Sequence, residues 1–145
     1  MEQRMNLAGE IPAGYKAMSG LEAYIQSTGI EKSLLELIKI RASQVNGCAF
    51  CIDMHTKDAR KAGETEQRIY MLNAWREAPF YSDAERAVLA LTEAVTLVTQ
   101  GHVPDEVYAE AARHFDTKRL SEIIMAIVTI NAWNRIAIST RMLPQ

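Results

Sequence analysis

Residues 118–139, KRLSEIIMAIVTINAWNRIAIS, contain the most apolar stretch of the chain, and apolar residues recur on nearly every face of the helix that they predict. Such a helix must be surrounded, either by the rest of its own domain or by another subunit. We expect both. The most apolar part, 123–133, is shorter than the roughly 20 residues needed to span a bilayer, which indicates a core helix. Arg135 is costly to bury alone, so we expect it to form a structural ion pair.

Prolines and glycines divide the rest of the chain into helix-sized segments. Within these segments the apolar residues recur at intervals of three and four, and no segment alternates with a period of two. Ser82 and Glu85 form a capping box, Asn46-Gly47 is typical of a helix stop, and Asp116 or Thr117 caps the last helix. The sequence predicts an all-α fold of about six or seven helices, at residues 12–27, 31–45, 48–62, 65–75, 82–101, 104–115 and 118–139.

Length and composition indicate a single domain, residues 1–145, with a short polar lead before a helical domain at about 12–138. The chain has 145 residues, 48% of them hydrophobic, and 16 Lys plus Arg against 18 Asp plus Glu give a net charge of −2. This balance lacks the basic surface of proteins that bind nucleic acids or anionic membranes, so we expect neither partner. The first residues do not resemble a signal peptide, and we expect a cytoplasmic protein.

Both cysteines of the chain lie in one Cys-x-x-Cys motif, Cys48-Ala49-Phe50-Cys51, followed by His55. If a helix begins at Cys48, the two sulfurs share a face and His55 lies one turn beyond Cys51. A helix N-terminus favours a thiolate over a thiol, and a histidine can exchange a proton with it. These residues are the parts of a reactive dithiol.

Three other interpretations remain open for this motif. A structural disulfide across four residues stabilises a fold by only about 2 kcal/mol. Two buried, unreactive thiols are common in protein cores. Zinc bound by Cys48, Cys51 and His55 is the strongest rival, although structural zinc sites usually take four ligands. On spacing alone, redox chemistry is favoured over zinc.

The motif also resembles a known family. Glu36, eleven residues, Cys48-x-x-Cys51, three residues and His55 reproduce the Glu-x11-Cys-x2-Cys-x3-His signature of alkylhydroperoxidase D-like proteins, in the carboxymuconolactone decarboxylase superfamily. The similarity extends from about residue 12 to 138 and includes the segments SQVNGC (43–48) and ARKAG (59–63) around the motif and NAWNR (131–135) near the end.

The resemblance implies a thiol-dependent peroxidase for organic hydroperoxides or hydrogen peroxide. Cys51 would be the peroxidatic cysteine, Cys48 the resolving cysteine, and Glu36 with His55 a proton relay. No cofactor and no metal are implied. An external dithiol, either a lipoyl group or a thioredoxin-like protein, would reduce the disulfide. The family fold is a compact helical domain that forms homo-oligomers, here expected to be a trimer or a hexamer.

One position departs from the family pattern. Some peroxidase members carry a histidine immediately before the second cysteine, where this chain has Phe50. An aromatic ring cannot relay protons, so slower peroxide reduction or a more apolar substrate is expected. Two alternatives stay open: a non-catalytic zinc-binding or redox-sensing protein using the same residues, and a lyase like the decarboxylases, which generally lack the cysteine pair.

Overall fold

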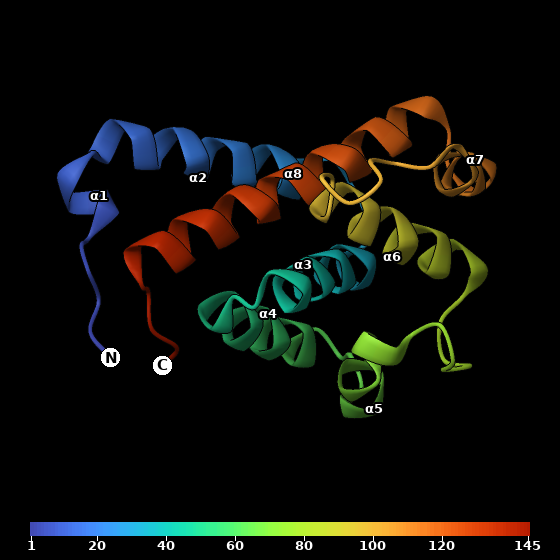
Figure 1. The fold of residues 1–145 in the computed structure, drawn as a ribbon, viewed down its shortest axis with the longest axis horizontal. Coiled ribbons are helices and arrows are strands. Elements are labelled where there is room, and N and C mark those ends of the chain that lie inside the picture. The colour runs from blue at the N-terminus through green and yellow to red at the C-terminus, as the bar shows by residue number, and fades with distance from the viewer.

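Helix α3 (Lys32–Asn46) forms the centre of the structure, a computed structural model that describes residues 1–145. Helices α4 (Ala49–Lys61), α6 (Asp83–Thr96) and α8 (Thr117–Thr140) pack around it (Figure 1). The remaining elements are α1 (Leu7–Glu10), α2 (Pro12–Ser27), α5 (Glu66–Tyr70), the 3-10 turn η1 (Leu72–Ala74) and α7 (Asp105–His114). Every regular element is helical, which confirms the predicted all-α class.

Most of the core belongs to two clusters that meet at α3, and a third, small cluster contains Cys48, Cys51 and Ala137. Ile38 belongs to the larger cluster, which packs α3 against α6, α7 and α8. Leu37, the next residue back, belongs to the second cluster, formed with residues of α5, η1 and α6. Nine residues of α3 are buried, including Glu36 and Lys39. Helix α3, rather than α8, is therefore the most completely surrounded helix, and it carries two charged residues into the interior.

Helix α8 is covered on one side only. It runs beside α2 and packs against α3 and α6 (Figure 1). Its length and composition would allow it to cross a membrane, but half of its apolar window is buried within the chain, as in a core helix. Met125, Val128 and Ile138 on the other side are exposed. The expected ion pair of Arg135 is absent, because its guanidinium hydrogen-bonds to the side chain and backbone of Asn131 instead.

Several predicted helix ends are confirmed by their cap geometry. Gly47 terminates α3 with a φ of 67°, a left-handed conformation that glycine adopts without steric cost. Ser82 and Glu85 form the reciprocal capping box of α6, and the Asp116 side chain caps α8. Pro104 is the N-cap of α7, one position before the predicted first turn.

Three boundaries differ from the prediction. The N-terminal lead includes the short helix α1, with Asn6 as its side-chain cap. The predicted helix 65–75 is divided into α5 and η1, an arrangement in which Ile69, Leu72 and Trp75 all join the second core cluster. Helix α6 ends at Thr96 instead of near 101; Val98 beyond it is exposed, so no burial favours continuing the helix.

Candidate functional site

The turn between α3 and α4 sets the positions of the two cysteines. After Gly47 reverses the chain, the backbone amide of Cys48 donates to the carbonyl of Ser43 at 2.9 Å. Cys48 is the extended N-cap of α4, and Cys51 is in the first turn of that helix. Both are free thiols, 1% and 2% exposed. The predicted helix start at the first cysteine is thus confirmed, and both cysteines pack in one small buried cluster with Ala137 of α8.

The two thiols titrate as a pair. The hydrogen bond from Cys51 lowers the pKa of Cys48 to about 7, against a raising effect of burial. The same bond, together with burial, raises the pKa of Cys51. Since one proton is held between the sulfurs, these pKa values describe the pair: the first proton leaves near neutral pH and the second is strongly retained. Transfer of the shared proton to Cys48 would place the charge on Cys51.

Glu36 and His55 meet in the interior, one from α3 and one from α4. The His55 Nδ1 atom lies 3.2 Å from Glu36 Oε2, with both side chains under 10% exposed. The distance is that of an ion pair, yet the angles do not make a hydrogen bond, and neither atom has another partner. Catalytic hydrogen bonds in ligand-free structures are often poorly aligned and tighten when substrate binds, and a separation of 3.2 Å is short enough for such a bond.

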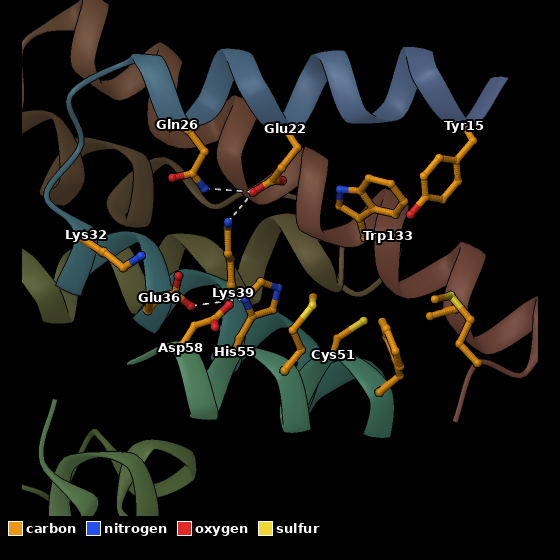
Figure 2. Close-up of a pocket in the computed structure, with 14 residues that line it drawn as sticks. Tyr15, Glu22, Gln26, Lys32, Glu36, Lys39, Cys51, His55, Asp58 and Trp133 are labelled. Carbon is orange, nitrogen blue, oxygen red and sulfur yellow. Dashed lines mark hydrogen bonds and ion pairs between the residues drawn. The ribbon is translucent and has the colours of Figure 1, made fainter. Parts of the chain in front are cut away.

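These groups face a cavity of about 390 Å³ enclosed by α2, α3, α4 and α8 (Figure 2). Cys51 lines the cavity and Cys48 does not. At one end the walls are aromatic and apolar: Tyr15 and Trp133 make an edge-to-face contact with centroids 5.6 Å apart, and Phe50 is nearby in the lining. At the other end the walls are polar and charged. The complete lining is Tyr15, Glu22, Gln26, Lys32, Glu36, Lys39, Phe50, Cys51, Met54, His55, Asp58, Trp133, Ala137 and Met142.

A buried ion pair attaches α2 over this cavity. Lys39 is 3% exposed, and its ammonium bonds to the carboxylate of Glu22, which also accepts from Gln26 at 3.0 Å (Figure 2). Burial raises the pKa of Glu22, but the hydrogen bond and charge of Lys39 outweigh it, and the net pKa is lowered. The sequence analysis did not identify this pair. Lys39 lies one turn after Glu36, which was the available signal, but Glu22 is joined to it only by the packing of α2.

The structure also shows which residues are able to hold a metal ion. Glu36, His55 and Asp58 bring ligand atoms within 4.8 Å of one another. Cys48, Cys51 and His55 do not form such a group, so the geometry does not support zinc binding by the cysteine pair. A divalent metal in this cavity would instead contact one imidazole and two carboxylates, the ligands of a harder, oxygen-rich site.

Comparisons with known proteins agree with this description. The Carboxymuconolactone decarboxylase family matches residues 10–94. An uncharacterized protein of Bacillus subtilis, YdfG, is 50% identical over 96% of this chain and 95% of its own. The crystal structure of a protein of unknown function from Agrobacterium tumefaciens, described as a putative antioxidant defence protein AhpD, superimposes with a TM-score of 0.97 and 42% identity over 99% of both chains. Alkyl hydroperoxide reductase AhpD of Hyphomonas neptunium is 40% identical over 45 residues, 31% of this chain and 25% of its own.

Proposed function

The chain belongs to the carboxymuconolactone decarboxylase family, and from this membership and the site geometry we propose that it is a thiol-dependent peroxidase of the AhpD type. One observation supports the proposal above the others. The thiol of Cys51 lines a cavity that also holds the buried Glu36–His55 pair, while Cys48 lies outside the lining and packs in the same small cluster as Cys51. A nucleophile, a proton relay and a resolving thiol therefore occupy one site.

In the proposed reaction, the Cys51 thiolate attacks the terminal oxygen of a hydroperoxide, and the O–O bond breaks. The sulfur is oxidised to a sulfenic acid, and the peroxide is reduced to an alkoxide that takes a proton from the His55–Glu36 relay. The Cys48 thiol then attacks the Cys51 sulfur, which forms the disulfide and releases water. Each turnover consumes one peroxide and leaves one disulfide.

A second dithiol must reduce this disulfide by thiol–disulfide exchange. We propose a lipoyl group or a thioredoxin-like protein as the electron donor. Organic hydroperoxides suit the cavity better than hydrogen peroxide, because Phe50, Trp133 and Tyr15 give its wall an aromatic, apolar end. Phe50 supplies no proton, so His55 and Glu36 carry the whole proton transfer.

We further propose that the chain works as a homo-oligomer, a trimer or a hexamer, in the cytoplasm. The exposed Met125, Val128 and Ile138 on α8 support a subunit contact, since an exposed apolar patch often marks a protein–protein interface. Two cysteines in one local motif, instead of several spread along the chain, are compatible with a reducing compartment.

The proposal is tested by titrating free thiols before and after one equivalent of cumene hydroperoxide. The wild type should lose both thiols and form one intramolecular disulfide. Cys48→Ser should stop at the Cys51 sulfenic acid, which dimedone traps, and Cys51→Ser should leave the peroxide unconsumed. Glu36→Gln should retain the fold and lose most of the rate. Wild-type turnover by Cys51→Ser with a dithiol donor would contradict the assignment.

The alternatives give different results in the same samples. A lyase that uses Glu36 and His55 without the thiols would keep lactone turnover in a variant lacking both cysteines. A zinc protein would contain stoichiometric zinc after purification under reducing conditions, and Cys48→Ser would change its zinc content. Neither outcome is expected for a peroxidase.

A further inference from the structure

The segment NAWNR (131–135) lies on α8 and has no part in the reaction above, yet its side chains are connected by hydrogen bonds to the region of the cysteines. Asn134 is completely buried on α8, and Ala137, one turn further along the helix, packs against both Cys48 and Cys51. The Asn134 amide has a lowering effect on the pKa of both thiols. Burying a carboxamide is unfavourable unless each polar atom has a partner. The hydrogen-bond partners of this side chain therefore determine which way its amide oxygen and nitrogen face.

A chain of hydrogen bonds connects the side-chain amides of Asn131, Asn46 and Asn134. Its direction is set by Arg135, which can only donate hydrogen bonds. Its guanidinium donates to Asn131 Oδ1 at 2.9 Å, so the oxygen of that amide must face it. The Asn131 Nδ2 atom is accordingly directed away, donating to Thr96 Oγ1 and to the carbonyl of Ile127, both at 2.9 Å. The amide of Asn131 thus has one allowed orientation.

The same constraint passes through Asn46 to Asn134. Asn46 Nδ2 donates to Asn131 Oδ1 at 2.9 Å and to Asn134 Oδ1 at 2.9 Å, which occupies both of its hydrogens. The Asn134 oxygen therefore faces Asn46, and its Nδ2 faces Ser43 and the cysteines. One hydrogen of Asn134 Nδ2 goes to Ser43 Oγ at 3.0 Å. Ser43 accepts it, because its own hydroxyl donates to the carbonyl of Lys39 at 2.7 Å.

Ser43 Oγ takes one hydrogen of Asn134 Nδ2, and the second hydrogen is left without an oxygen acceptor beside the cluster of Cys48, Cys51 and Ala137. We propose that Asn134 is a thiolate-stabilising residue whose free N–H donates to the cysteine pair, aimed there by the hydrogen-bond chain that begins at Arg135. A hydrogen bond from a neutral amide favours the charged form of its acceptor. Because a thiol needs this donor less than a thiolate does, Asn134 assists the step in which the reactive anion forms.

This inference rests on the proposed function only in taking the thiolate as the reactive form, and it is measured without peroxide. The pH titration of thiolate ultraviolet absorbance is recorded for the reduced wild type and for Asn134→Asp and Asn134→Leu. Both variants lack the N–H, so we expect about a fivefold or larger decrease in the thiolate fraction at pH 7, near the wild-type pKa of about 7. Circular dichroism establishes that the variants are folded.

Asn131→Asp is the matched control. Its carboxylate still accepts hydrogen bonds from Arg135 and Asn46, so Asn46 and Asn134 keep their amide orientations. Only the bonds that Asn131 donates to Thr96 and Ile127 are lost. We expect its thiolate fraction to match the wild type. An effect confined to Asn134→Asp would indicate charge repulsion, and an equal effect in Asn131→Asp would indicate general loosening of the structure; either result overturns the inference.

The two proposals fail separately. If the Asn134 variants raise the thiol pKa but the wild type does not react with hydroperoxide, the peroxidase assignment is wrong and the role of Asn134 stands. If the wild type reacts and the Asn134 variants titrate like it, the role of Asn134 is wrong and the peroxidase assignment stands.

Discussion

Replacing Cys51 by alanine tests the coupling between the two thiols. The hydrogen bond from Cys51 is the largest effect that lowers the pKa of Cys48, from an ordinary value of 9.0 to about 7. With this donor removed, we expect the pKa of Cys48 to return toward 9.0. At pH 7 the thiolate fraction then falls from about one half to about one hundredth, a decrease of roughly 50-fold for a change of about two pKa units.

Thiolate absorbance is the appropriate measurement, because Cys48 is buried and alkylation would also report access. Cys48→Ala is the matched control: the retained Cys51 loses the partner that raises its pKa, so its pKa should fall toward the same ordinary value. Each single-cysteine variant should thus titrate above the first step of the wild type. A Cys51→Ala variant that still titrates near pH 7 would refute the reasoning and assign the low pKa to the α4 N-terminus or to Asn134.

Three further predictions concern stability. Glu22→Gln leaves the ammonium of Lys39 buried without its counter-charge and should lower the free energy of unfolding by about 3 kcal/mol. Lys39→Met should lower it clearly less, because the side chain of Glu22 is 27% exposed and can be hydrated. Urea denaturation of both variants and of the double variant measures the difference. Because the pKa of Glu22 is lowered by folding, its stabilising contribution is present above about pH 4.5 and is lost as the pH falls through the folded-state pKa, so Glu22→Gln should show a smaller loss of stability in acid than the wild type. Gly20→Ala should stabilise the fold by about 0.5–1 kcal/mol, because a Cβ added at this position inside α2 meets nothing within 4 Å. Gly47→Ala should destabilise the fold by about 1 kcal/mol, because residue 47 has a φ of +67°. Thermal unfolding measures both, and midpoints that shift in the same direction would contradict this prediction.

The position of the helices follows largely from local chemistry, and for that reason it was predictable. Gly47 tolerates the left-handed conformation, Ser82 and Glu85 satisfy each other's backbone amides, and Asp116 accepts from the first turn of α8. These devices act within a few residues, so they can be recognised in the sequence alone. Where the prediction failed, the outcome depended on burial. Ile69, Leu72 and Trp75 join a core cluster that includes residues of α3, whereas Val98 beyond Thr96 is exposed.

The motif likewise identified Cys48, Cys51 and His55 as neighbours, because helical spacing places them on one face. Its spacing also named Glu36, although only the resemblance to a family gave that residue importance. The sequence by itself therefore determined the fold class and the reactive residue types. These conclusions need nothing beyond the short-range geometry of a helix and its caps.

Only the tertiary structure decided how those residues are arranged. It shows that Cys51 faces the cavity and Cys48 does not, and that Glu36 and His55 approach to 3.2 Å. It joins Lys39 to Glu22, 17 residues away, and Asn134 to Ser43, 91 residues away. The physical reason is that a buried polar atom must find a partner wherever the packed helices provide one, and such partners have no fixed separation along the chain.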